Sequence, residues 1–422
     1  MTHSPFDTVT PERGFLPSFD PCSRLEVSGA EAWESALAQL PQLRVASGND
    51  ALRSFLRALP VFPTDAVLQV GATDQSQLWR AYLLLSFLSH SYMWCEDGPT
   101  PQILPARLAQ PWVAVAAALD MPPVLVYATY NLYNWRKIDP AGPIALGNIC
   151  CLHNFFGGQD EEWFRLVHVQ IEVACASAVA GLPAMQAAAQ AGDAPRVQAG
   201  CEAIRAALAE AQRVLARMEE KCDPYIYYHR VRQPMSGWRN NPLLPNGLIY
   251  EGVSDTPMQL YGETGAQSSI VAAFDAALGI THDSVWLRDY LDGMQAHMPP
   301  THRAFIAAVA GPHVRSMCGA SSAPAAPTGL AHGGADASAG GVGTGAHGVV
   351  SGGGGATGGA LRGAYNGAVG ELERFRAQHR AFAYSYIAKF SKAAVGGDKG
   401  TGGSDFMPAL QGYRETTAGH RL

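Results

Sequence analysis

Apolar residues along this chain recur mostly three or four positions apart, and the alternating apolar and polar runs typical of half-buried strands are rare. One stripe is long and regular. An N-cap at Asp193 with a proline at Pro195 predicts the start of its helix, and Asp223-Pro224 predicts the end. We therefore predict an all-α protein. The stripe consists of Val197, Cys201, Ile204, Leu208, Ala211, Leu215 and Met218.

Further helices are predicted over Trp163–Leu182, closed by Pro183, and from Arg362 to about Phe390. The most hydrophobic stretch, Leu78–Trp94, contains a charged residue and several polar ones, so it predicts a buried helix rather than a membrane span. The proline-rich stretches at 100–111 and 121–124 predict irregular connections.

The pattern also predicts two domains. Residues 1–155 are expected to form a small N-terminal helical domain, and residues 156–422 a large C-terminal helical bundle. Residues 319–360 interrupt the bundle, because they hold 15 of the 45 glycines and Asp336 as their only charged side chain. Such a composition cannot bury enough apolar surface to order itself, so we predict a flexible insertion.

The helix predicted from Arg362 carries a histidine inside its apolar stripe. His379 fills the missing step between Phe375 and Phe382. This pattern is more often a core histidine bonded to backbone, but it also suits an iron ligand, since haem needs one neutral imidazole in an apolar pocket. The remaining stripe residues are Tyr365, Val369, Leu372 and Tyr386.

Two polar residues accompany this histidine. Arg376 lies one turn before it and would need a carboxylate if buried, and Asp275 in the apolar segment 270–280 is the partner we choose. A second histidine, His168, shares the apolar face of the helix at 163–182. The pattern leaves open whether His168 is a distal pocket residue, a second iron ligand or a core residue.

Composition narrows the class of protein. The net charge of −6 offers no basic surface for nucleic acid. The eight cysteines form no CxxC pair, and the N-terminus has no basic flank followed by an apolar run. We therefore expect a cytoplasmic protein with reduced thiols, with neither nucleic acid nor a membrane as partner.

Several segments together resemble the indoleamine 2,3-dioxygenase family, over nearly the whole chain apart from 319–360. They include PPVLVYATYNLYNW, SGWRNNPLLPNGLIYEG, AQSSIVAAFDAALGI, RAQHRAF and KGTGGSD, in the family's order. The resemblance implies an all-α fold with a small and a large domain enclosing haem b. It also implies that the enzyme, which we expect to be a monomer, uses O2 to open the indole ring of L-tryptophan, giving N-formylkynurenine.

The resemblance assigns roles to individual residues. His379 matches the proximal iron ligand, and Asp275 and Arg376 match a pair that supports the ligand's helix. Arg232, otherwise readable as a surface charge, matches the arginine that holds the substrate carboxylate. The other matching positions are Tyr127, Phe164 and Tyr228 at the indole pocket, Gly265 on a loop beside the haem, and Thr401 within the loop Gly400–Gly403, which could be a plain linker or a mobile lid.

Three residues depart from well-known members of the family. His168 stands where mammalian members have serine, which makes it a candidate catalytic residue beside Arg232. Tyr130 stands where some have cysteine, at the inner end of the indole pocket, and Arg165 replaces an aromatic residue. Two rival functions remain: a haem sensor with both His168 and His379 on iron, and a helical scaffold without haem.

Overall fold

The computed structural model describes residues 4, 6–46, 50–94, 98–282, 284–320, 353–391, 400–401 and 406–422. Helices dominate it, and the strands, two to five residues long, form two small sheets, so the predicted all-α class is confirmed. In one sheet β4 (Leu248–Tyr250) pairs with β1 (Ile103–Leu104) and with β5 (Ser254–Met258). In the other, β2 (Trp135–Lys137) pairs with β3 (Ile149–Cys151).

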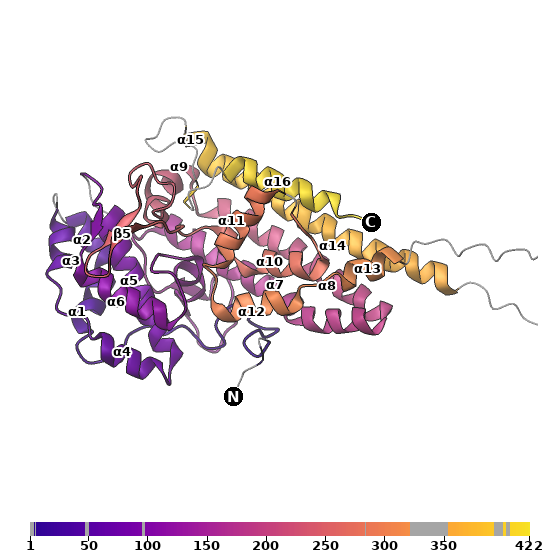
Figure 1. The fold of residues 1–422 in the computed structure, drawn as a ribbon, viewed down its shortest axis with the longest axis horizontal. Helices are drawn as coiled ribbons and strands as arrows, with labels where there is room; N and C mark the ends of the chain where they lie inside the picture. The colour runs from indigo at the N-terminus through magenta and orange to yellow at the C-terminus, as the bar shows by residue number, and fades with distance from the viewer. Residues whose placement is uncertain are drawn as a thin grey trace, which may run out of the picture.

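The N-terminal helices gather at one end of the molecule (Figure 1). The central one, α5 (Gln75–Trp94), is buried along almost its whole length, as its predicted span implied. Since β1 pairs with β4, a later part of the chain also joins this end, and the division at residue 155 stays a prediction. The surrounding helices are α1 (Glu31–Ala38), α2 (Leu40–Ala46), α3 (Ala51–Arg57), α4 (Thr64–Gly71) and α6 (Ala106–Ala118).

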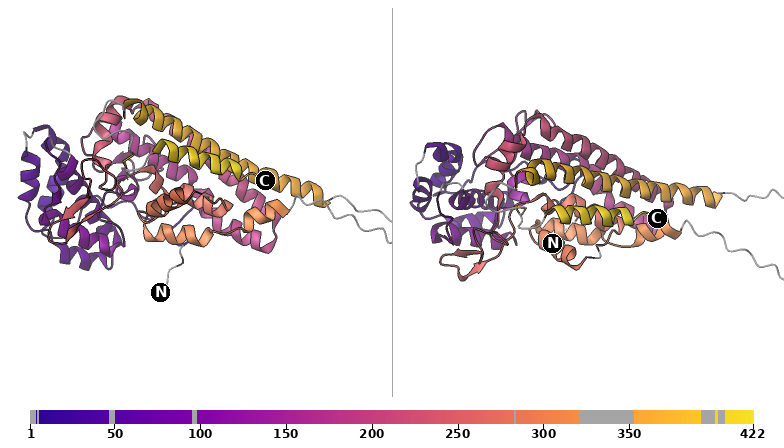
Figure 2. Two further views of the ribbon diagram at one scale, coloured as in Figure 1. Left: turned by 45° about the horizontal axis from the view of Figure 1, so that its top comes forward. Right: turned by 90° about the horizontal axis from the view of Figure 1, so that it is seen from above.

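Three long helices run side by side through the rest of the molecule (Figure 2). These are α7 (Gln159–Ala191), α8 (Ala194–Ala216) and α14 (Gly353–Ala383). The predicted stripe of α8 is fully buried, and the Asp193 side chain caps the helix by accepting from the Arg196 N–H. The shorter elements around them are α9 (Pro224–Ile226), α10 (Ser269–Leu278), α11 (Val285–Gln295), α12 (Pro300–Val309), α13 (His313–Ala320), α15 (Lys389–Ser391) and α16 (Phe406–Gly419).

Two predicted helix breaks, both at prolines, are wrong. Pro183 lies inside α7, which continues to Ala191 and ends at Gly192 in the left-handed conformation (φ 75°). Pro111 lies inside α6, within a stretch predicted to be irregular. In both helices buried packing outweighs the hydrogen bond that the proline removes.

The glycine-rich segment is also shorter than predicted at both ends. The structure places 313–320 in α13 and begins α14 at Gly353, so 319, 320 and 353–360 are helical. Propensity disfavours glycine in a helix, but helix α14 packs against α8 and α16, and tertiary contact decides. The predicted flexible insertion otherwise falls on 321–352, which lies outside the described residues.

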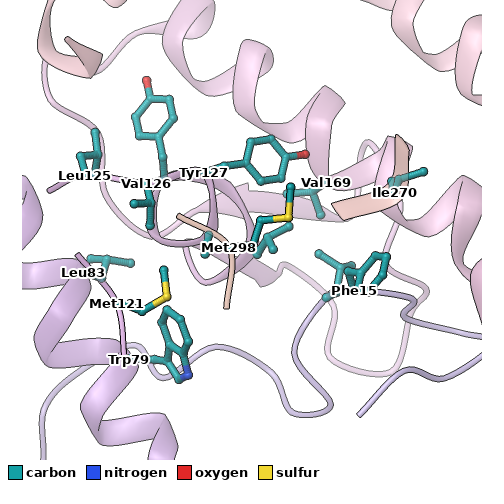
Figure 3. Packing of buried hydrophobic residues seen from close by; sticks show 14 of the residues in the cluster. Phe15, Trp79, Leu83, Met121, Leu125, Val126, Tyr127, Val169, Ile270 and Met298 are labelled. Carbon is teal, nitrogen blue, oxygen red and sulfur yellow. The ribbon is translucent and has the colours of Figure 1, made fainter. Parts of the chain in front are cut away.

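Within the described residues, α7 alone is long and apolar enough to cross a membrane by length and composition. Just over half of that apolar window is buried inside the protein, and a buried core helix meets the same criterion. The core itself joins both ends of the molecule. Figure 3 shows Trp79 and Leu83 of α5 in one cluster with Tyr127, Val169 of α7 and Ile270 of α10.

Candidate active site

A cavity of about 600 Å³ opens between α7, α8, α10, α14 and the loop that precedes α10. It collects most of the predicted site residues from segments far apart in the sequence. Tyr130, Tyr228 and Arg232 are not among its lining residues. The predicted residues that line it are Tyr127, Phe164, His168, Gly265, Asp275, Arg376, His379 and Thr401.

His379 presents its imidazole to this cavity from α14, between the partly buried rings of Phe375 and Phe382. Burial, and to a smaller extent the nearby His168, lowers the pKa of His379 to about 4, so the imidazole is neutral at physiological pH. Loop backbone approaches closely, because a Cβ at Gly265 would lie 3.8 Å from Nε2. A neutral imidazole on an apolar cavity has the donor chemistry that haem iron needs, so these residues fit a haem.

Asp275 and Arg376 form the predicted ion pair behind His379. Nη2 of Arg376 lies 2.5 Å from Oδ2 of Asp275, and Nη1 donates to Thr417. Burial opposes ionisation of Asp275, but the charge of Arg376 and the hydrogen bonds outweigh it and hold the pKa below its ordinary value. Such contacts fix the orientation of a ligand's helix.

The sequence reasoning missed a third member of this group. Nε2 of His282 lies 3.3 Å from Oδ2 of Asp275, and its ring packs edge-on against Tyr413. No periodicity could reveal this contact, because α10 ends at Leu278 and the chain turns before His282.

On the opposite wall, α7 contributes His168 and Phe164. Nδ1 of His168 lies 2.7 Å from the carbonyl oxygen of Phe164, and burial lowers the pKa of His168. The neutral ring therefore donates from Nδ1 and keeps its lone pair on Nε2. The rings of Phe164 and Tyr127 lie 4.6 and 5.9 Å from the His168 ring, which gives an aromatic half-pocket.

Tyr127 is held by polar contacts that the sequence did not show. Its backbone N–H donates to Gln267, and its hydroxyl donates to Oε1 of Glu172 at 3.1 Å. The Ser268 hydroxyl donates to the same oxygen at 3.1 Å, and burial raises the pKa of Glu172 to about 7. Glu172 lies one turn after His168 on α7, a spacing that could have pointed to it.

Two of the predicted pocket residues lie behind the wall. Tyr130 is fully buried under the guanidinium of Arg165, whose Cζ lies 4.5 Å from the ring centroid. Tyr228 packs on Phe390 instead, and its neighbour Tyr227 reaches the cavity, 4.8 Å from the Phe164 ring. The sequence alone could not choose between two adjacent tyrosines.

Arg232 follows a π-helical turn, Tyr227–Val231, with its guanidinium 5.5 Å from the centroid of Tyr228. Burial lowers the pKa of Arg232, partly offset by the two neighbouring tyrosines. It lies close to the wall that Tyr227 forms, so its predicted role at the substrate carboxylate stays a prediction.

Thr401 is anchored at the cavity edge. Its hydroxyl donates to the carbonyl oxygen of Glu263 at 2.6 Å, and its own carbonyl accepts from the Gly237 N–H at 3.2 Å. A Cβ at Gly262 would lie 2.2 Å from the Gly237 nitrogen, so only glycine permits this crossing. The other glycines of the predicted lid, 402 and 403, lie outside the described residues.

Comparison with known proteins identifies the family of this chain. The family described as Indoleamine 2,3-dioxygenase matches residues 4–420. Indoleamine 2,3-dioxygenase 1 of Rattus norvegicus is 31% identical over 401 residues, covering 91% of this chain and 88% of its own. Indoleamine 2,3-dioxygenase 2 of Homo sapiens is 40% identical over 230 residues, 54% of this chain and 56% of its own.

A relative with another name matches as well. A myoglobin of Haliotis madaka is 34% identical over 252 residues, which are 58% of this chain and 64% of its own. The predicted haem dependence fits both groups of relatives and the neutral imidazole on the cavity. This chain belongs to the indoleamine 2,3-dioxygenase family of haem-dependent enzymes.

Proposed function

We propose that this protein holds haem b on His379 and inserts both atoms of O2 across the indole C2–C3 bond of L-tryptophan, giving N-formylkynurenine. The observation that carries the proposal is the placement of His379, His168 and Phe164 around one largely apolar cavity. His379 would hold the haem through its neutral imidazole, and the haem would supply the chemistry with O2. The product keeps every atom of both substrates, so turnover consumes no external reductant.

When bound, the haem supplies the oxygen chemistry, and the protein supplies placement and electrostatics. The rings of Phe164, Tyr127 and Tyr227 form aromatic walls for a flat indole. The bare Nε2 of His168 accepts a hydrogen bond from the indole N–H. Arg232 holds the carboxylate, because a guanidinium can donate two parallel hydrogen bonds to it.

The direct test is to incubate the reduced, haem-loaded protein with L-tryptophan and ¹⁸O2 and to analyse the product by mass spectrometry. We expect N-formylkynurenine with both oxygens labelled, and none in an anaerobic control. Absence of this product, or incorporation of one labelled atom, would contradict the proposal.

The alternative is a haem protein that binds ligands without efficient turnover. It is favoured by the similarity to the Haliotis madaka myoglobin and by the nearness of His168 to His379. A six-coordinate bis-histidine spectrum of the ferrous protein, together with no product, would support it. We further propose that the protein is a cytoplasmic monomer. Light scattering after size-exclusion chromatography would test its oligomeric state.

A further inference from the structure

The cavity wall also holds a buried carboxylate, that of Glu263. Glu263 is only 3% exposed, yet it lines the cavity together with Tyr127, Tyr227 and Thr401. It stands on the loop between the Gly262 crossing and Gly265. Buried carboxylates of this kind are costly unless they gain a donor or a cation.

The backbone of Glu263 is fixed at the Arg232 side of the cavity. The Glu263 N–H donates to the Met235 carbonyl oxygen at 3.0 Å. The Met235 N–H in turn donates to the Arg232 carbonyl oxygen at 3.1 Å. The Glu263 carbonyl accepts from the Thr401 hydroxyl. Glu263 and Arg232 are therefore linked through backbone hydrogen bonds of Met235.

The carboxylate itself is only partly satisfied. Nδ2 of Asn131 donates to Oε1 at 3.1 Å, and no ion pair with Glu263 is formed by the described residues. Burial raises the pKa of Glu263 to about 8, although Asn131 and the more distant charge of Arg165 oppose the shift. Glu263 is then mostly neutral near pH 7, and a cationic group entering the cavity would favour its ionised form and supply the missing partner.

Arg232 and Glu263 are both connected to one residue of the wall, Tyr227. Burial raises the pKa of the Tyr227 hydroxyl, the charge of Arg232 lowers it, and the charge of Glu263 raises it. Geometry agrees, because the Arg232 N–H donates to the Tyr227 carbonyl oxygen at 2.9 Å and Tyr227 lines the cavity together with Glu263. An α-amino acid carries a carboxylate and an ammonium group on one carbon, which matches this arrangement.

We propose that Glu263 is a specificity-determining residue that binds the α-ammonium group of the substrate. The inference rests on the proposed function, since it assumes that the ligand is an indole amino acid. Arg232 takes the carboxylate and Glu263 the ammonium, so the site selects the zwitterion over acids of the same shape.

The test compares the binding of L-tryptophan with that of indole-3-propionate, which lacks the ammonium group. Binding is followed by the absorption change of the ferric haem protein, which needs no turnover. In Glu263→Gln, which keeps an acceptor for Asn131, we expect L-tryptophan to bind about 10- to 150-fold more weakly, as for lost hydrogen bonds to charged groups. Indole-3-propionate should change little.

The matched control is Glu172→Gln, the other buried carboxylate beside Tyr127, which should leave the ratio of the two affinities unchanged. An unchanged ratio in Glu263→Gln would overturn the inference alone. Binding with the expected ratio but without product would overturn only the proposed reaction. If Glu263→Gln does not load haem, the two affinities are compared in the wild-type protein and in Glu263→Asp. A wild-type protein that binds L-tryptophan no more tightly than indole-3-propionate would overturn the inference.

Discussion

Nδ1 of His168 lies 2.7 Å from the carbonyl oxygen of Phe164, one turn earlier on the same helix. This bond fixes which nitrogen carries the proton, so Nε2 can accept from a substrate but has no proton to give. A hydrogen-bond acceptor is what an indole N–H needs. The relationship excludes Nε2 as a proton donor in this state and favours its role as a hydrogen-bond acceptor.

We therefore expect His168→Ser to keep turnover within about tenfold of wild type, a loss of no more than ~1.4 kcal/mol of transition-state stabilisation. The measurement is kcat/KM for L-tryptophan in haem-loaded protein. 1-Methyltryptophan, which lacks the N–H, should discriminate poorly between the two proteins. A fall beyond about a hundredfold would make His168 an acid–base catalyst.

His379→Ala should abolish stoichiometric haem binding while leaving the chain folded. The imidazole faces a cavity rather than a packed core, so its removal leaves no buried group without its bond. Haem content per chain and circular dichroism measure the two effects. A mutant with normal haem content and an unchanged ferrous spectrum would refute the assignment.

Arg232→Ala should weaken L-tryptophan binding by roughly 2–5 kcal/mol, because a desolvated carboxylate would lose its partner. Indole analogues without a carboxylate should be much less affected. Arg232 packs near Tyr228 behind the cavity surface, so the comparison also tests a structural role. Equal losses for both ligands would show that the residue only supports the wall.

Asp275→Ala should weaken haem retention more than His282→Phe. Removing Asp275 leaves the buried charge of Arg376 uncompensated, which costs roughly 3–5 kcal/mol. His282→Phe removes one hydrogen bond and keeps a ring against Tyr413, a loss of about 1 kcal/mol. Transfer of haem to a scavenger protein measures retention, and equal transfer rates would contradict the predicted order.

The buried His90 should make the free energy of unfolding depend on pH. Its Nδ1 lies 2.7 Å from the Pro234 carbonyl oxygen, and its Nε2 accepts from the Leu125 N–H at 2.9 Å. Burial lowers its pKa to about 3. Because the folded pKa lies below the unfolded value of about 6.5, this stabilisation is complete above pH 6.5 and declines as pH falls towards 3.

Urea denaturation at several pH values tests this. Between pH 6 and pH 4, His90→Gln should reduce the slope of the unfolding free energy against pH by about one proton. His302 is buried with a pKa lowered to about 3, so the mutant should keep part of the slope. Parallel curves for mutant and wild type would show that His90 does not carry the effect.

The helices could be predicted because they follow from periodicity, which also placed His379 on an apolar stripe, while its role as iron ligand came from the family resemblance and stays a prediction. The stripe of α8 is buried as predicted, and His379 could be recognised as the residue that interrupts an apolar stripe without breaking it. Charge complementarity identified Asp275 as the partner of Arg376, since few carboxylates lie in apolar segments.

The polar contacts of the loops could not be predicted. Glu263 and His282 lie outside helical stripes, and their contacts with Asn131 and Tyr413 join segments that only the tertiary fold brings together. The predictions at the prolines 111 and 183 were wrong for a different reason. Local propensity predicted breaks there, whereas burial of the helix faces on both sides preserved the helices.

Helix α14 has a practical consequence. It begins at Gly353, next to the end of α13, at the end of the molecule opposite the N-terminal helices (Figure 1). At 1.5 Å per residue, the 26 residues from there to His379 span roughly 39 Å. A fluorescent reporter joined between α13 and α14 would thus sit far from the cavity, and α14 would connect it to His379. The junction is the natural place to build a biosensor on this scaffold.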